Sequence, residues 1–174
     1  SLSIDVYVDA AFAVGWGIDD PNDPSSVKSR AGHIIEFMGC PVIWSSKLEN
    51  LIATSTMEAE YCALSMALRA AIPLHSLCDS VAKGLGLSKD RLTTFKTTVY
   101  EDNEGAMKLA RMEPNRTTPR SKFYALRMHW FRSWLKPKDI EIKYIKSKDQ
   151  KADFLTKPLT AELFEANRKL SCGW

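Results

Sequence analysis

The order of the secondary-structure signals constrains the fold of this chain more strongly than any other feature. Three segments rich in β-branched and aromatic residues come first, and helix and strand signals alternate after them. Strands joined by turns favour antiparallel pairing and strands separated by helices favour parallel pairing, so we predict an α/β domain with a mixed sheet flanked by helices. The strands are expected at 4–12, 31–37, 41–46, 96–100 and 140–145, and the helices at 55–72, 74–85, 103–111, 121–135, 147–157 and 159–170.

Length and composition fit a single globular domain. The chain has 174 residues, of which 45% are hydrophobic and 26% are charged, so it can bury a core without disulfides or a structural metal. Its four cysteines form no C-x-x-C pair, which favours free thiols in a reducing compartment over a zinc site. The sequence has no signal peptide and no run of 18 apolar residues, so we expect no membrane span. The first residue is serine, which suggests a processed product or a piece excised from a larger protein.

Charge is distributed unevenly along the chain. Residues 1–114 contain 10 Lys or Arg and 15 Asp or Glu, whereas residues 115–174 contain 14 and 6. The net charge of +3 therefore combines an acidic part with a basic part. This asymmetry suggests a polyanionic partner beside a site that gathers carboxylates, although an ordinary solvated surface would give the same totals.

Two aspartates follow the apolar runs of predicted strands. Asp9 ends the apolar run that begins at Ile4, and Asp102 follows the strand that ends at Tyr100. In open sheets the carboxyl ends of the strands border the crevice in which ligands bind, so both side chains are candidates for a functional site. A structural alternative for Asp102 is that it caps the helix that follows it.

The helix that begins after Ser55 contains two glutamates with different predicted roles. Glu58 has the capping-box spacing from Ser55, which gives it a structural task. Glu60 lies on the same face as the apolar residues Leu64 and Leu68, where a carboxylate is costly unless it is paired or binds a metal. We therefore predict that Glu60 is functional and that Glu58 is structural.

A fourth acidic position is ambiguous from spacing alone. Asp149 and Asp153 lie four residues apart, on one face of the helix predicted after Ser147. Asp149 falls in the first turn, where the helix dipole favours negative charge, whereas Asp153 precedes an apolar pair nearer the buried side. Spacing leaves the choice between them open.

Convergence of these acidic residues would create a metal site. A cage formed by Asp9, Glu60, Asp102 and Asp153 would carry four negative charges that repel one another strongly without counter-ions. Hard oxygen ligands in that number favour Mg²⁺ or Mn²⁺ over zinc. Two such ions could activate a water molecule and stabilise the leaving oxygen of a phosphodiester.

Several short motifs occur in order along nearly the whole chain. They are Val8-Asp9-Ala10, Trp44-Ser45-Ser46-Lys47, the segment 55–64, Tyr100-Glu101-Asp102-Asn103, the segment 127–132 and the segment 149–159. Together they resemble the ribonuclease H domain of copia-type LTR retrotransposons, which closes the reverse transcriptase part of the polyprotein. Several motifs at compatible spacings are more specific than any one of them.

This resemblance implies a fold, an activity and a site. The fold is that of ribonuclease H, in which a five-stranded mixed sheet has its first three strands antiparallel and helices on both faces. The activity is metal-dependent hydrolysis of the RNA strand of RNA–DNA hybrids during reverse transcription, with two Mg²⁺ ions and products that carry 5′-phosphate. The acidic residues of the family fall on Asp9, Glu60, Asp102 and Asp153, so the resemblance prefers the last of these over Asp149.

The resemblance also implies partners and a location. We expect residues 1–174 to form a single ribonuclease H domain at the C-terminal end of a reverse transcriptase polyprotein, intracellular and associated with cytoplasmic virus-like particles. An alternative is a catalytically weak or inactive domain that binds nucleic acid and supports the attached reverse transcriptase. A third possibility is another nuclease or strand-transfer enzyme with the same fold. No membrane partner is expected.

A basic part of the chain is the candidate for contact with the hybrid. Basic residues recur through the predicted loop and helix at 116–138, where Trp130 and Trp134 lie four residues apart. The basic side chains could grip the DNA backbone of a hybrid, or they could be solvated while the tryptophans pack on the sheet. The residues predicted to contact nucleic acid are Asn103, Arg120, Lys122, Arg127, Arg132, Lys146 and Lys148.

Overall fold

A computed structural model describes residues 2–87, 95–113, 116–117, 119 and 129–173 of the chain. In this part, a five-stranded sheet has the strand order β3-β2-β1-β4-β5. Strand β1 pairs antiparallel with β2, and β2 with β3, whereas β4 runs parallel to both β1 and β5. The predicted mixed sheet is confirmed, with strand boundaries within two residues of those expected. The strands are β1 (Leu2–Ala11), β2 (Arg30–Phe37), β3 (Cys40–Leu48), β4 (Phe95–Glu101) and β5 (Ile140–Tyr144).

The parallel pairing of β1 with β4 brings the carboxyl ends of these strands to the same edge of the sheet. The register places Tyr7 opposite Tyr100. Asp9, near the carboxyl end of β1, and Asp102, directly after β4, each lie two residues further along, so they stand at the same level of the sheet. On the other side, Asp9 is paired with Gly32 of β2. The sheet alone therefore places two of the predicted carboxylates side by side.

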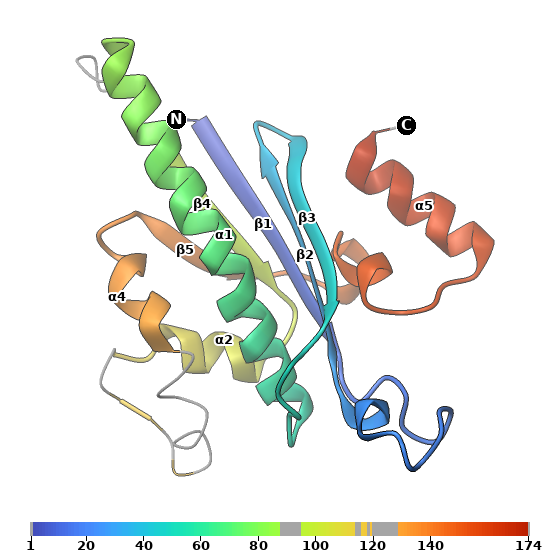
Figure 1. Cartoon of the computed structure of the whole chain (residues 1–174). Coiled ribbons are helices and arrows are strands. Elements are labelled where there is room, and N and C mark those ends of the chain that lie inside the picture. Colours follow the sequence, from blue (N-terminus) through green and yellow to red (C-terminus); the bar gives the residue numbers. More distant parts are fainter. Residues whose placement is uncertain (1, 88–94, 114–115, 118, 120–128, 174) are drawn as a thin grey trace.

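Helices cover both faces of the sheet (Figure 1). Helix α1 (Thr56–Gly84) runs along one face and packs against β1 and β2. Helix α2 (Glu104–Arg111) contacts α1, and α4 (Arg132–Leu135) lies near β5. Helix α5 (Ala161–Cys172) lies on the far side of the sheet from α1, next to β3. This arrangement confirms the predicted fold class.

Helix α1 begins where the sequence predicts and forms much of the core. The Ser55 hydroxyl accepts a hydrogen bond from the Glu58 amide, and the Glu58 carboxylate accepts two from Thr54, so Glu58 has the expected structural task. Leu64 and Leu68 are fully buried against the sheet. Among the described helices, α1 alone is long and apolar enough to cross a membrane, but 56% of that stretch is buried inside the protein, as in a core helix.

One predicted helix boundary is wrong. Pro73 is predicted to end or kink a helix before another begins at Leu74, but α1 continues through both residues to Gly84. Proline lacks the N–H that would bond the carbonyl of Arg69 one turn earlier. Both Arg69 and Pro73 are exposed, so water can satisfy that carbonyl and the helix tolerates the proline.

The segment after β5 also differs from its prediction. The spacing of Ser147 and Gln150 predicts an α-helix, but the segment forms two short 3₁₀ helices, η4 (Ser147–Asp149) and η5 (Asp153–Leu155). Its two capping side chains make tertiary hydrogen bonds instead, Ser147 to Asp102 and Gln150 to the sheet. No α-helix forms here because these side chains bond to distant parts of the chain and do not cap a helix.

The remaining helix predictions differ only in extent. Helix α2 is confirmed, and Asn103 caps it by accepting a hydrogen bond from Ala106. Helix α5 begins two residues later than predicted, after its cap Thr160. The helix predicted at 121–135 lies mostly outside the described residues, and its described end forms the 3₁₀ helix η3 (His129–Phe131) followed by α4.

Candidate metal centre

Three of the predicted carboxylates converge at the edge of the sheet where β1 and β4 end. Asp9, Glu60 and Asp102 each offer a carboxylate oxygen, and these three oxygens all lie within 4.8 Å of one another. Asp9 belongs to β1, Asp102 follows β4, and Glu60 comes from the first turns of α1. Asp9 and Glu60 are buried and Asp102 is half-buried, so solvent reaches this carboxylate cluster from the side of Asp102.

Glu60 is a buried carboxyl group with no partner for one of its oxygens. Its Oε2 atom is buried and has no hydrogen-bond partner among the described residues. Burial, followed by the carboxylates of Glu101, Asp9 and Asp102, raises the pKa of Glu60 to about 10. A carboxyl group in these surroundings stays neutral at physiological pH unless a cation joins it.

Glu101 is a further buried carboxylate beside the cluster, and it was not among the predicted site residues. Its Oε1 atom accepts a hydrogen bond from the amide of Asn103, whereas Oε2 has no partner in the described part of the chain. Burial raises the pKa of Glu101 well above its ordinary value, and the Asn103 hydrogen bond opposes this only in part. The signal that could have found it is the alternation of β4, because Glu101 shares a face with the buried residues Thr97 and Val99.

Asp9 is held by the segment that follows β5. The Thr156 hydroxyl donates a hydrogen bond to Oδ2 of Asp9, and the Lys157 ammonium nitrogen lies 3.7 Å from the same oxygen. Burial raises the pKa of Asp9, while these two contacts lower it. Thr156 can come so close because the neighbour of Asp9 on β2 is glycine. A Cβ atom on Gly32 would lie 2.7 Å from Cγ2 of Thr156 and 2.9 Å from Cβ of Leu155.

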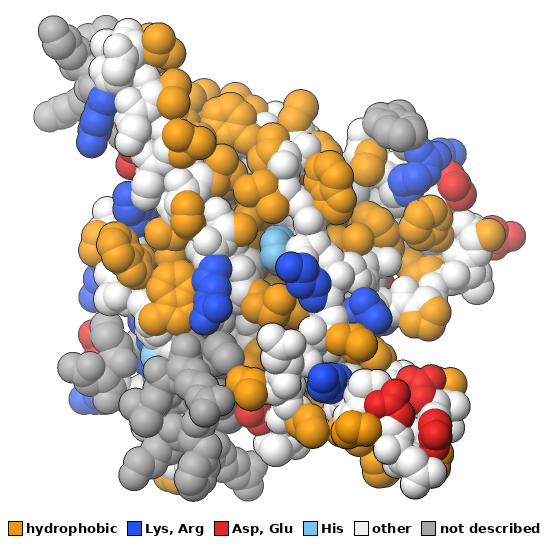
Figure 2. All heavy atoms as spheres, in the orientation of Figure 1, with side chains coloured by type: hydrophobic (Ala, Val, Ile, Leu, Met, Phe, Trp, Pro, Cys, Tyr) orange, Lys and Arg blue, Asp and Glu red, His pale blue; other side chains and the backbone are white. Residues whose placement is uncertain are grey.

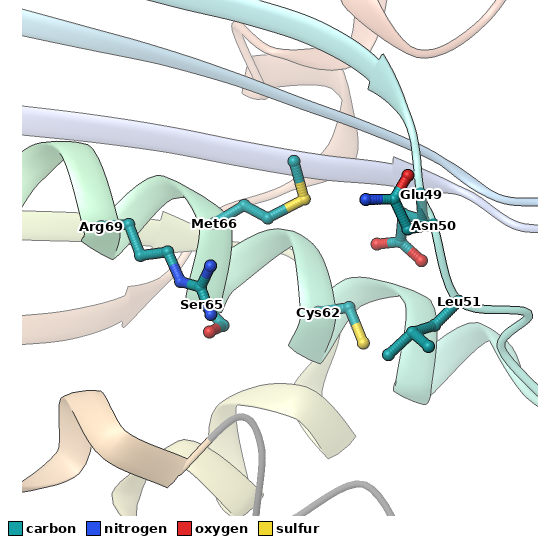
Figure 3. Close-up of a pocket in the computed structure, with 7 residues that line it drawn as sticks. All are labelled: Glu49, Asn50, Leu51, Cys62, Ser65, Met66 and Arg69. Atoms are coloured by element: carbon teal, nitrogen blue, oxygen red, sulfur yellow. The ribbon is translucent and has the colours of Figure 1, made fainter.

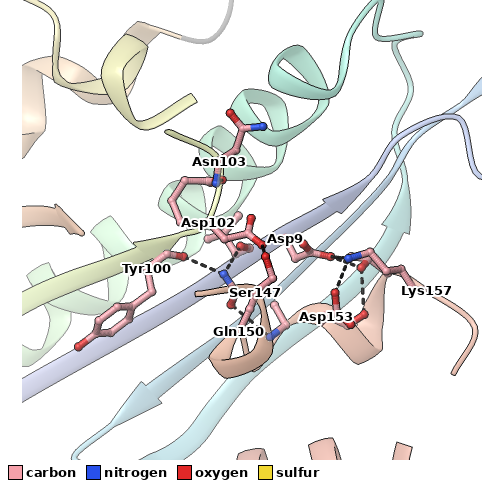
Figure 4. A network of polar contacts seen from close by, with 12 residues as sticks. Asp9, Tyr100, Asp102, Asn103, Ser147, Gln150, Asp153 and Lys157 are labelled. Atoms are coloured by element: carbon pink, nitrogen blue, oxygen red, sulfur yellow. Dashed lines mark hydrogen bonds and ion pairs between the residues drawn. The ribbon is translucent and has the colours of Figure 1, made fainter. Parts of the chain in front are cut away.

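Gln150 joins the two strands that carry the aspartates (Figure 4). Its side chain is 1% exposed, and Nε2 donates hydrogen bonds to the carbonyls of Val8 at 2.8 Å and Tyr100 at 3.3 Å. Val8 directly precedes Asp9, and Tyr100 lies two residues before Asp102. The hydroxyl of Ser147, from the same segment, donates to Oδ2 of Asp102 at 2.6 Å. One short segment therefore orients both aspartates.

Asp153, the predicted fourth ligand, lies at the margin of the cluster. It is not among the carboxylates whose oxygens lie within 4.8 Å of one another. Its Oδ1 atom forms an ion pair with the Lys157 ammonium, which thus stands between Asp153 and Asp9 (Figure 4). Asp149 is exposed and forms the end of η4. The structure thus brings Asp153 next to the cluster and leaves Asp149 outside it.

The donor set of the cluster fits a divalent cation that prefers oxygen ligands. Its three members are carboxylates, which favours Mg²⁺ or Mn²⁺ over zinc. The ion pairs of the described residues include Asp9 and Asp153, but neither Glu60 nor Asp102. A bound cation would satisfy the orphaned oxygen of Glu60 and offset the mutual repulsion of the carboxylates.

The structure corrects the role predicted for Arg132. Its side chain is 4% exposed. The guanidinium donates hydrogen bonds to the Tyr61 hydroxyl and to the carbonyls of Leu109, Glu113 and Arg116. Arg132 therefore links α4 to α1, to α2 and to the chain after α2, and its guanidinium is directed into the protein. The sequence prediction rested on the basic composition of this segment, which does not reveal that the Arg132 side chain points inward.

The other predicted contacts with nucleic acid have different outcomes. Asn103 caps α2 with its side-chain oxygen, which frees Asp102 from that task. Lys146 and Lys148 are exposed on the segment that orients the aspartates. On the face drawn in Figure 2, acidic side chains gather over the loop between β1 and β2, while Lys and Arg side chains are spread over the rest. Arg120, Lys122 and Arg127 lie outside the described residues.

A separate pocket of about 450 Å³ lies between α1 and the segment after β3 (Figure 3). The three converging carboxylates do not line it. One of its walls is formed by Glu49, whose side chain is 4% exposed and whose carboxylate oxygens both lack a partner among the described residues. The lining residues are Glu49, Asn50, Leu51, Cys62, Ser65, Met66 and Arg69.

Sequence comparison relates the chain to Pol polyproteins of plant transposons. It is 29% identical over 152 residues to the retrovirus-related Pol polyprotein from transposon TNT 1-94 of Nicotiana tabacum, a match that covers 87% of this chain. It is 29% identical over 181 residues to the corresponding polyprotein from transposon RE2 of Arabidopsis thaliana, a match that covers 99%. The chain spans 11% of the length of each relative. No protein-family model matches it.

Solved structures identify the fold. LC11-RNase H1, isolated from compost, superposes with a TM-score of 0.54 at 19% identity, over 94% of this chain and 96% of that protein. The chain has the ribonuclease H fold. The N-terminal ribonuclease H domain of a Mycobacterium tuberculosis protein also superposes with a TM-score of 0.54, at 15% identity, over 97% and 98% of the two chains. This fold and the transposon relatives together confirm the resemblance to a ribonuclease H domain of a copia-type polyprotein.

Proposed function

We propose that this chain is a metal-dependent endoribonuclease that hydrolyses the RNA strand of RNA–DNA hybrids during reverse transcription. The observation that carries the proposal is the convergence of Asp9, Glu60 and Asp102 at the carboxyl edge of the sheet, with an orphaned buried oxygen on Glu60. The ribonuclease H fold and the Pol relatives support it. A structure of LC11-RNase H1, at 19% identity and a TM-score of 0.51, contains an RNA/DNA hybrid.

In the proposed reaction, the residues of the cluster would hold the metal ions and keep them in position. Divalent ions, Mg²⁺ in our proposal, would supply a Lewis acid that activates water and stabilises the leaving oxygen of the phosphodiester. Asp9, Glu60 and Asp102 would hold a first ion, and the hydroxyls of Thr156 and Ser147 keep two of these carboxylates in place. In this proposal Asp153, at the margin of the cluster, helps to hold a second ion. The products of hydrolysis carry a 5′-phosphate.

The binding surface and cellular setting belong to the same proposal. Lys146 and Lys148 are exposed next to the segment that orients Asp102, so they are placed to contact phosphates of the hybrid. Arg120, Lys122 and Arg127 are further proposed contacts. We infer that the domain works attached to a reverse transcriptase, in intracellular virus-like particles, because the part that matches this chain is only 11% of the length of its Pol polyprotein relatives.

Cleavage of a labelled RNA–DNA hybrid in Mg²⁺ tests the proposal. Asp102→Asn removes a ligand charge with little change of shape, and it should slow cleavage by roughly a hundredfold or more while circular dichroism stays native. Asp149→Asn, which removes an exposed aspartate outside the cluster, should leave the rate unchanged. EDTA should abolish cleavage by the wild type. Unchanged cleavage by folded Asp102→Asn would contradict the assignment.

The position of Lys157 favours a second candidate function. Its ammonium already pairs with Asp9 and Asp153, which could limit metal binding. The chain would then be a weak or inactive ribonuclease H-like domain that binds nucleic acid in support of an attached polymerase. Tight binding of the hybrid by the wild type, without cleavage in Mg²⁺ or Mn²⁺, would favour this candidate over the first.

A further inference from the structure

Lys157 lies between Asp9, a member of the carboxylate cluster, and Asp153 at its margin. Its ammonium nitrogen is 3.7 Å from Oδ2 of Asp9 and forms an ion pair with Oδ1 of Asp153, four residues earlier (Figure 4). The Asp9 side chain is 1% exposed and that of Asp153 is 21% exposed, so the bridge is largely shielded from water on the carboxylate side. Shielding strengthens the attraction between these charges.

The two ends of the metal centre differ in how their charge is balanced. At the end formed by Glu60 and Asp102, no described basic side chain lies within ion-pair distance of either carboxylate, and Oε2 of Glu60 has no hydrogen-bond partner among the described residues. At the end formed by Asp9 and Asp153, the ammonium supplies one positive charge. A divalent ion would therefore relieve repulsion at the first end, but it would meet a like charge at the second.

We propose that Lys157 is a built-in competitor for the second divalent ion. In the free protein one ion binds to Asp9, Glu60 and Asp102, and a second can bind between Asp9 and Asp153 only after the ammonium moves away. This inference rests on the metal centre of the proposed function. The Lys157 side chain is 43% exposed, so it has a path into solvent. A phosphate of the hybrid would offer the displaced ammonium a new partner, which would couple the second ion to substrate.

Titration of the 174-residue chain with Mn²⁺ alone, without nucleic acid, tests this inference. Isothermal titration calorimetry and electron paramagnetic resonance of free Mn²⁺ both count bound ions without relying on activity. The wild type should bind one Mn²⁺. Lys157→Met keeps about the length of the side chain but removes its charge. This variant should bind two Mn²⁺ ions, and the second should bind at least about tenfold more tightly than any second ion in the wild type.

Two further variants separate competition from general charge effects. Lys157→Arg keeps the positive charge and should retain one bound ion. Lys108→Met removes a lysine from an equivalent i,i+4 pair with Glu104 on α2, and it should bind Mn²⁺ like the wild type. Circular dichroism verifies that each variant is folded.

The outcomes distinguish this inference from the proposed function. If both the wild type and Lys157→Met bind one ion with equal affinity, the metal centre stands and the competition is refuted. If neither binds Mn²⁺, the metal centre and the inference both fail. Should Lys157→Met not fold, the wild type decides alone, because two ions of similar affinity in the free wild type would also refute the competition.

Discussion

Glu49 is a buried carboxylate whose cost to stability can be measured by neutralising it. It follows β3 and forms a wall of the pocket in Figure 3, and neither of its carboxylate oxygens has a partner among the described residues. Burial, followed by the nearby carboxylate of Glu58, raises the pKa of Glu49 from 4.5 to about 8. The folded protein thus keeps this group protonated at pH values where the unfolded chain ionises it.

The free-energy cost follows from these two pKa values. Because the pKa is higher in the folded state, Glu49 lowers the free energy of unfolding as the pH rises from 4.5 to about 8 and has little effect below that window. Each pH unit within the window costs about 1.4 kcal/mol. The full cost at pH 7 is therefore about 3 kcal/mol, and movement of the side chain toward water reduces it to roughly 2 kcal/mol.

The perturbation is Glu49→Gln, which keeps the shape of the side chain and removes its charge. In urea unfolding the variant should exceed the wild type in stability by less than about 1 kcal/mol at pH 5, and by about 2 kcal/mol at pH 7. Subtracting the wild type removes the pH dependence that Glu60 and Glu101 contribute through their own raised pKa values. Glu162→Gln controls for loss of an exposed charge. A stability difference that does not change with pH would refute the reasoning.

Two further predictions concern residues that position the site or the fold. In urea unfolding, Gly32→Ala should destabilise the protein by about 1–3 kcal/mol, because its Cβ would push Thr156 away from Asp9. In calorimetric titration the same variant should bind Mn²⁺ more weakly. The control is Gly84→Ala, whose Cβ meets nothing within 4 Å, and it should be neutral or stabilising in both measurements. Arg132→Met should cost about 3 kcal/mol in urea unfolding, because it removes buried hydrogen bonds, yet leave the salt dependence of hybrid binding unchanged. A flatter salt dependence in a folded Arg132→Met would restore its predicted role in binding.

Local patterns in the sequence were sufficient for the elements and for part of the site. Strand alternation and the order of elements predicted the mixed sheet, because pairing direction follows from the connections between strands. Helical periodicity separated Glu60 on the buried face from Glu58 at the helix start, and both placements are confirmed. Asp9 and Asp102 were found because they lie near or directly after the carboxyl ends of strands that turn out to be parallel neighbours.

The sequence by itself therefore determined the fold class and three carboxylates that meet, since each rests on periodicity or on the end of one element. Only the tertiary structure decided how those carboxylates are held. The hydrogen bond from Gln150 to Val8 spans 142 positions, and that from Thr156 to Asp9 spans 147. Contacts between segments so far apart depend on how the whole sheet is assembled. For the same reason, spacing could not place Lys157 between two aspartates, because local patterns specify an element but not what packs against it.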